Sequence, residues 1–201
     1  MTSAIEHEVP PPRHPERVFL FSGHMIDAPG RATPRFPPAA VPIARHAIEG
    51  TLGSLDANAS DLAIASGACG GDLLFAQACL KRGLPLLMYL PFSEPEFLER
   101  CVVYAGDCWR AAFIRVKCDP NTTTVLVTDN AGTSSADNAF ERSNLQILQA
   151  AYSFGVERTH FVCLWNGEYG DGPGGTRHFV QEVERGMGQV HWLDTRKLWR
   201  I

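Results

Sequence analysis

Residues 61–72 read DLAIASGACGGD, and their pattern indicates the class of fold. Its first part, Asp61–Ala65, is a short apolar run typical of a buried strand, and Ser66–Asp72 follows at once with three glycines. A helix predicted over Leu73–Arg82 ends at Gly83, a residue suited to the left-handed position after a helix. A strand, a glycine-rich turn and a helix in this order are typical of a βαβ unit. The stretch therefore predicts an α/β fold.

The same alternation continues on both sides of this stretch. Further strands are expected over Arg17–Phe21, Leu84–Leu90, Thr123–Val127, Thr159–Trp165 and Gln189–Leu193. Further helices are expected over Ala39–Leu55, Glu94–Val103, Asp107–Lys117, Asn138–Phe154 and Thr176–Gly186. Helices between buried strands predict a three-layer Rossmann-like sandwich with a mostly parallel central sheet. We expect residues 1–16 to form a flexible Pro-rich leader and residues 17–201 to form one ligand-binding domain.

The composition excludes several classes of protein. Hydrophobic residues make up 45% of the chain and charged residues 20%, which is ordinary for a soluble globular domain. The net charge of −4 disfavours a nucleic-acid polymer as partner. No apolar run is long enough to span a bilayer, and the N-terminus lacks the pattern of a signal peptide. The six cysteines form no C-x-x-C pair, which favours free thiols in the cytoplasm, and no metal site or cofactor is predicted.

Three loops that follow predicted strands carry the candidate site. They are Ser22-Gly23-His24, Ser66–Asp72 and Gly170–Thr176. Because ligands of open parallel sheets bind outside the carboxyl ends of the strands, we expect the three loops to meet at one edge of the sheet. The alternative for Ser66–Asp72 is a tight turn with no ligand, and the alternative for Gly170–Thr176 is a flexible surface loop.

The glycines of these loops point to an anion. Gly67, Gly70 and Gly71 allow the backbone to approach a phosphate, and the start of the following helix offers free N–H groups. Gly174 and Gly175 precede Thr176 in the same way, and the hydroxyl of Thr176 suits either an N-cap or a phosphate contact. Neither loop has the G-x-G-x-x-G or Walker A pattern, which argues against a dinucleotide dehydrogenase and a P-loop ATPase.

Charged and titratable residues near these loops complete the candidate set. Arg142 stands near a helix N-terminus, where the dipole disfavours a cation, and this favours an anionic partner over a solvated helix face. His24 is either a ribose contact or base, or a hydrogen-bonded structural residue. Arg31 and Arg35 flank a Pro-rich segment and could clamp a phosphate. Glu182 is either a catalytic carboxylate or a surface glutamate.

Several of these motifs, taken in order, resemble a known group. SGHMID at 22–27, SGACGGD at 66–72, LPF at 90–92, FERSN at 140–144 and PGGT at 173–176 resemble the SLOG superfamily over residues 17–195. This Rossmann-like group includes the Lonely Guy phosphoribohydrolases and sensors of nucleotide-derived signals. The resemblance implies a nucleotide site and a homodimer, with the helix at 138–154 as the candidate interface.

The resemblance also implies roles for individual residues. In the Lonely Guy enzymes a PGGxGTxxE motif binds phosphate and supplies a catalytic Glu, and an Arg in an ERK-like motif completes the site. Pro173–Thr176 match the first motif and Glu141 and Arg142 match the second. This chain lacks the intervening residue and second glycine, and Phe179 stands three positions beyond Thr176.

Two functions follow as expectations. The first is a sensor or regulatory domain that binds a nucleotide or nucleotide-derived small molecule. Its ligand would contact Ser22, Gly23, His24, Ser66, Gly67, Gly70, Gly71, Asp72, Arg142, Gly174, Gly175 and Thr176. The alternative is a nucleoside 5′-monophosphate N-glycosidase that releases the free base, a hydrolase in which Arg142 and either Glu182 or Asp72 act in catalysis.

Overall fold

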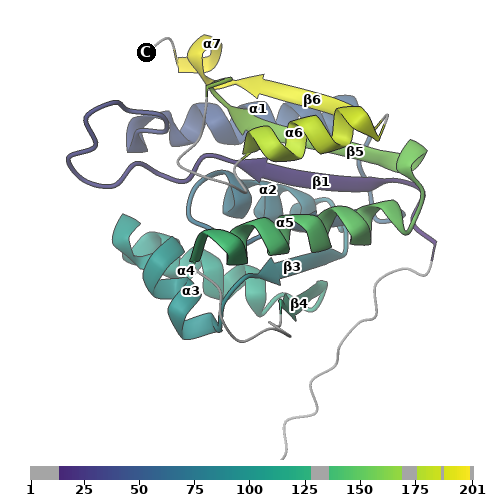
Figure 1. Cartoon of the computed structure of the whole chain (residues 1–201), viewed down its shortest axis with the longest axis horizontal. Helices are drawn as coiled ribbons and strands as arrows, with labels where there is room; N and C mark the ends of the chain where they lie inside the picture. Colours follow the sequence, from purple (N-terminus) through teal and green to yellow (C-terminus); the bar gives the residue numbers. More distant parts are fainter. Residues whose placement is uncertain (1–13, 128–135, 169–175, 187, 200–201) are drawn as a thin grey trace, which may run out of the picture.

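The structure is a computed structural model that describes residues 14–127, 136–168, 176–186 and 188–199, without the side chains of 136–138 and 178. Six strands form one parallel sheet in the order β4-β3-β2-β1-β5-β6. Helices cover both faces of this sheet (Figure 1). The prediction of an α/β, Rossmann-like three-layer sandwich is therefore confirmed.

The elements lie close to the predicted ranges. The strands are β1 (Val18–Gly23), β2 (Leu62–Ala65), β3 (Leu86–Leu90), β4 (Thr122–Leu126), β5 (Thr159–Trp165) and β6 (Gln189–Asp194). The α-helices are α1 (Val41–Ser54), α2 (Gly71–Lys81), α3 (Glu94–Cys101), α4 (Asp107–Lys117), α5 (Ala136–Tyr152), α6 (Thr176–Arg185) and α7 (Thr195–Trp199). Short 3₁₀ helices cover Pro38–Ala40, Val103–Ala105 and Val156–Arg158.

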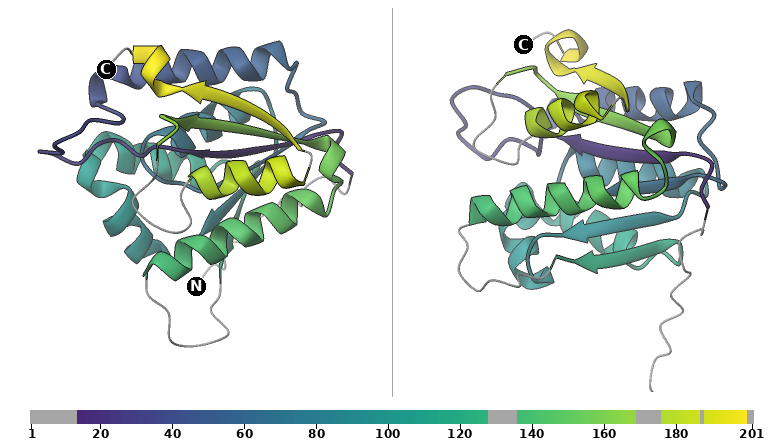
Figure 2. Two further views of the ribbon diagram at one scale, coloured as in Figure 1. Left: turned by 45° about the horizontal axis from the view of Figure 1, so that its top comes forward. Right: turned by 45° about the vertical axis from the view of Figure 1, so that its right-hand side comes forward.

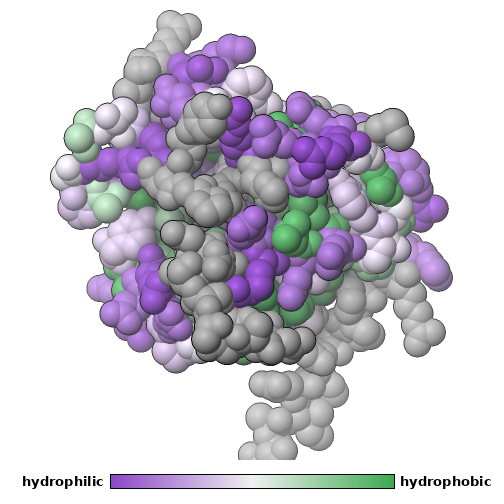
Figure 3. Space-filling model, in the orientation of Figure 1, coloured by the Kyte–Doolittle hydropathy of each residue, from purple (hydrophilic) through white to green (hydrophobic). Residues whose placement is uncertain are grey.

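The central strands β3, β2, β1 and β5 are buried on both faces, whereas the edge strands β4 and β6 are partly exposed. Along β1 the side chains alternate, so that Phe19 and Phe21 belong to a core with α1 and α2, while Val18 and Leu20 belong to a second core with α5 and α6. Figure 2 shows α5 and α6 together on one side of the sheet. On the face drawn in Figure 3, hydrophobic residues are visible in small groups among hydrophilic ones.

The strand order changes direction beside β1. The chain moves outward from β1 through β2 and β3 to β4, and then returns along α5 so that β5 pairs with the other side of β1. Figure 1 shows β1 and β3 ending at the edge of the sheet where α5 and α6 begin. This reversal is the point at which open α/β sheets bind their ligands. It places the candidate site between the ends of β1 and β2 and the starts of α5 and α6.

The loop between β1 and α1 is held to the body of the domain. The carboxylate of Asp27 accepts hydrogen bonds from the backbone N–H groups of Arg35 and Phe36 at 2.9–3.1 Å. The ring of Phe36 is buried and stacks on Trp199 of α7, with the ring centroids 5.2 Å apart. The short α7 was not predicted, and it covers this loop at its base. No helix within the described ranges is long and apolar enough to cross a membrane.

Candidate functional site

A cleft lies at the carboxyl ends of β1, β2 and β3 and encloses about 680 Å³ of empty space, its open mouth included. Among the residues that the structure describes, four hydroxyl side chains and one carboxyl group line it, together with apolar and aromatic groups from α3, α5 and α6. The polar side chains are those of Ser22, Ser66, Asp72, Ser143, Asn144 and Thr176. Two of the three predicted loops, the first and the second, therefore meet here, and the start of α6 joins them.

Ser22 and Thr176 face each other in this cleft. Ser22 lies in the last part of β1 and Thr176 is the first residue of α6, and their hydroxyl oxygens are 3.2 Å apart. Both residues are half-buried. The N-terminal end of α6 therefore opens on the cleft, and the partial positive charge of a helix N-terminus favours an anion there.

Asp72 is the carboxyl group of the cleft. It is 8% exposed, and its Oδ2 accepts a hydrogen bond from the Ala68 N–H at 3.4 Å. Burial raises the pKa of Asp72 to about 7, against the smaller opposing effect of that hydrogen bond. The position in the first turn of α2 favours the charged form, but desolvation outweighs it. A carboxyl group with such a pKa can give or take a proton near neutral pH.

The glycines of the second loop have a packing role. Gly70 has a φ of +110° and forms a bridge with Met25, and a Cβ there would lie 2.8 Å from the Ile26 nitrogen. At Gly71 a Cβ would lie 2.9 Å from the Phe21 ring, and the Gly71 N–H donates to the His24 carbonyl at 3.1 Å. This N–H at the start of α2 is therefore used within the protein rather than offered to a ligand.

Gly23 and Gly67 also have a packing role. A Cβ at Gly23 would lie 2.9 Å from the Cβ of Leu164 and from the Phe21 ring. At Gly67 it would lie 2.9 Å from the sulfur of Met88. Gly23 lines the cleft, and close packing with its neighbours explains both residues without a ligand.

His24 connects the first loop to the end of β5. The side chain is 8% exposed, and its Nε2 accepts a hydrogen bond from the Asn166 N–H at 3.1 Å. Its own backbone N–H donates to the Leu164 carbonyl at 2.9 Å. His24 does not line the cleft, so the geometry matches the structural alternative stated for it.

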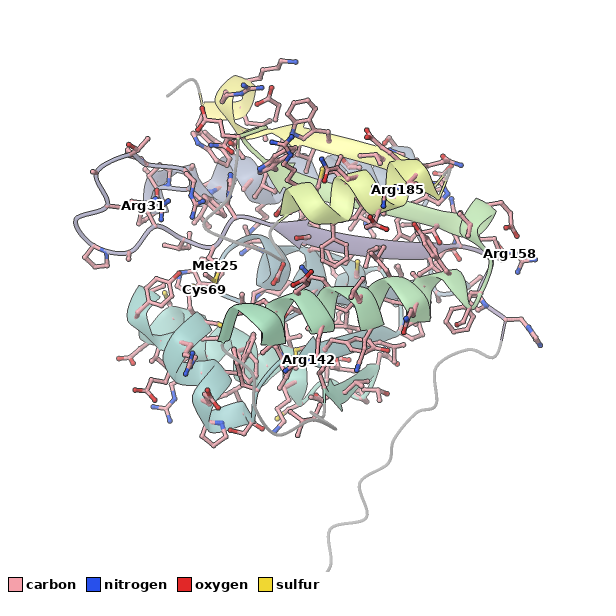
Figure 4. The ribbon with its side chains drawn as sticks, viewed as in Figure 1. Met25, Arg31, Cys69, Arg142, Arg158 and Arg185 are labelled. Atoms are coloured by element: carbon pink, nitrogen blue, oxygen red, sulfur yellow. The ribbon has the colours of Figure 1, made fainter. Side chains whose placement is uncertain are left out.

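The structure places Arg142 and Glu182 outside the lining of the cleft. Arg142 is half-buried and lies on the side of α5 turned away from α6 (Figure 4). Glu182 lies almost two turns beyond Thr176, where its carboxylate forms an ion pair with Arg185. Gly174 and Gly175 lie outside the described residues.

Some lining residues were missed by the sequence reasoning. Phe140, Ser143, Asn144 and Ile147 of α5 line the cleft, and their spacing of three and four residues places them on one face of the helix. Arg142 is two positions from Phe140 and therefore projects from a different face. This spacing was readable in the sequence, whereas the aromatic side chains of Phe97 and Phe179 carried no signal beyond their apolar character.

The chemistry of this lining suits an organic ligand with hydroxyl groups. Within the ranges that the structure describes, no group of three His, Cys, Asp or Glu side chains is arranged to hold a metal ion.

Neither a protein-family model nor a curated protein matches the chain.

Proposed function

We propose that the cleft binds a nucleotide or nucleotide-derived small molecule and that the domain acts as a sensor or regulatory module. The observation that carries the proposal is the lining itself: hydroxyl groups, a carboxyl group and aromatic groups line one cleft at the reversal of strand order. Serine, threonine and carboxyl groups suit the hydroxyls of a sugar, and the Phe140 side chain suits a flat base. The start of α6 suits a phosphate.

The residue three positions beyond Thr176 supports recognition without hydrolysis, because the Lonely Guy motif has its catalytic Glu at that position. This residue is Phe179, which is 1% exposed, lines the cleft and stacks on Phe161 with the ring centroids 5.6 Å apart. A buried phenylalanine cannot activate water or stabilise a cationic sugar as a carboxylate does.

Calorimetric titration with a panel of nucleosides, nucleoside monophosphates and nucleoside diphosphates tests the proposal. We expect at least one nucleotide to bind the folded wild-type protein and to be recovered unchanged. Ile147→Trp narrows the cleft and should abolish the binding, whereas Leu145→Trp, on the exposed face of α5, should leave it intact. Binding that survives Ile147→Trp would place the ligand elsewhere.

The second candidate, a nucleoside 5′-monophosphate N-glycosidase, is favoured by the position and pKa of Asp72. As a carboxylate, Asp72 would accept a proton from a water molecule while the water oxygen bonds to the anomeric carbon. The bond from that carbon to the base nitrogen breaks, and the base leaves with the electron pair and takes a proton from solvent. Chromatography of free base after incubation with nucleoside monophosphates separates this function from simple binding. Release should be lost in Asp72→Asn and retained in Glu182→Gln.

A further inference from the structure

A second cleft adjoins the first and has a different lining, and it encloses about 600 Å³ of empty space with its open mouth included. Three arginine side chains line it, two from the loop after β1 and one from α3: Arg31, Arg35 and Arg100. Met25 lines both clefts and is 40% exposed, which is unusual for a methionine. Figure 4 shows Met25 close to Cys69, between α3 and the loop that carries Arg31.

The backbone that carries these arginines is fixed by hydrogen bonds. Asp27 holds the Arg35 and Phe36 N–H groups, and its carboxylate lies 3.5 Å from the Arg31 Nε. The Tyr104 hydroxyl donates to the Ile26 carbonyl at 2.8 Å, which fixes the loop to the segment after α3.

Arg100 reaches this cleft from α3. Its guanidinium carbon lies 4.9 Å from the centre of the Phe92 ring, and its Nη2 lies 3.0 Å from Glu96. Contacts with neighbouring groups therefore position the guanidinium groups of Arg31 and Arg100.

Guanidinium groups outnumber carboxylates among the described residues that line this cleft. Those lining residues include three arginines and one acidic residue, Asp27, and the Glu96 carboxylate pairs with Arg100, whereas the net charge of the whole chain is −4. The Asp27 carboxylate is also engaged by two backbone N–H groups. A concave surface with an excess of guanidinium groups attracts anions, and the planar guanidinium fork matches the oxygens of a phosphate.

We infer that the arginine cleft binds a phosphate group of the ligand held in the first cleft. This inference rests on the proposed function and narrows the class of ligand. One phosphate would lie at the start of α6, and a second would reach past Met25 to Arg31, Arg35 and Arg100. The ligand is therefore a nucleotide with two separated phosphate groups, the class to which nucleoside 3′,5′-bisphosphates belong.

The test compares 5′-monophosphates with 3′,5′-bisphosphates of adenosine and guanosine by calorimetry. We expect a bisphosphate to bind the wild type at least about ten-fold more tightly than its monophosphate, because the added charge-assisted hydrogen bonds are strong. In R31Q/R35Q/R100Q this preference should disappear while the monophosphate still binds. The control R110Q/R115Q/R185Q makes the same change of charge at exposed positions outside both clefts and should keep the preference.

The outcomes separate this inference from the proposed function. Monophosphate binding with no gain for the bisphosphate, or a gain that survives in R31Q/R35Q/R100Q, overturns the inference and leaves the proposed function standing. If no nucleotide binds the folded wild type, the proposed function fails and the inference fails with it. Thermal melting checks that each variant folds, and the single variant R35Q replaces the triple variant if the latter does not. A reduced bisphosphate preference in R35Q then supports the inference, and an unchanged one opposes it.

Discussion

The hydroxyl oxygens of Ser22 and Thr176 lie 3.2 Å apart, although 154 positions separate the two residues in the sequence. Ser22 belongs to the central strand β1 and Thr176 begins α6, on the far side of the reversal in strand order. Their contact therefore links the two halves of the sheet at the cleft. A ligand that enters the cleft can contact both hydroxyl groups. Substitutions at these two residues are therefore suited to change binding while the fold is kept.

Thr176→Val should weaken nucleotide binding by about five-fold, because the variant keeps the shape of the side chain and loses its hydrogen bond, a change of about 1 kcal/mol. Calorimetric titration of the nucleotide selected from the panel measures the effect. Thr51→Val is the matched control, since Thr51 lies on α1 and its hydroxyl donates to the Ala47 carbonyl away from the cleft. Equal affinity of the two variants would contradict a role for Thr176 in the site.

Asp72 should make the stability of the protein depend on pH. Burial raises its pKa from 3.8 to about 7, so the folded protein binds more protons than the unfolded chain between these values. The stabilisation that protonated Asp72 provides is complete below about pH 4 and is lost as the pH rises through about 7. Asp72→Asn removes the ionisable group, and should be more stable than the wild type at about pH 8 by on the order of 4 kcal/mol.

Urea denaturation of the wild type and the variant at about pH 5 and about pH 8 measures this difference. The free energies of unfolding should differ much less at the lower pH. Glu99→Gln, at an exposed position on α3, should show the same dependence on pH as the wild type. A constant difference between Asp72→Asn and the wild type across the two pH values would show that Asp72 does not titrate in this range.

Much of the fold could be predicted because the inner strands are mostly apolar runs. β5 has the predicted bounds, Thr159–Trp165, since all seven of its residues are buried and the run ends in polar residues on both sides. The short α7, Thr195–Trp199, could not be predicted because five residues are too few to show a helical period. Its stability depends on tertiary contacts such as the stacking of Trp199 on Phe36.

The candidate site was predictable in position and only partly in composition. The rule that ligands bind at the carboxyl ends of parallel strands brought Ser22, Ser66 and Thr176 to one cleft. The rule says nothing about the direction of a side chain on a neighbouring helix. It therefore could not predict that Arg142 lies outside the lining of the cleft. Gly70 and Gly71 allow the second loop to pack closely against the first loop. A sequence cannot distinguish such glycines from those that approach a ligand.

Gly70→Ala should destabilise the protein more than Gly106→Ala. Both glycines have φ values above +100°, which cost an alanine about 1–2 kcal/mol of stability. At Gly106 the added Cβ meets open space, whereas at Gly70 it would lie 2.8 Å from the Ile26 nitrogen and 2.9 Å from the His24 oxygen. Urea denaturation of both variants separates the strain of the backbone from the clash with the first loop. Equal free energies of unfolding would mean that the loop moves away at no cost.

His24→Phe should lower the free energy of unfolding by about 1–3 kcal/mol, because the buried Asn166 N–H loses its acceptor. His46→Phe on α1 replaces an exposed histidine and should change stability little, so it serves as the control. His24→Gln offers a carbonyl oxygen to the same N–H and should recover part of the loss. Since His24 ties the first loop to the end of β5, His24→Phe should also weaken nucleotide binding by loosening the cleft wall beside it. If His24→Phe is as stable as His46→Phe, the bond to Asn166 does not support the fold, and His24 would again be a candidate for contact with the ligand.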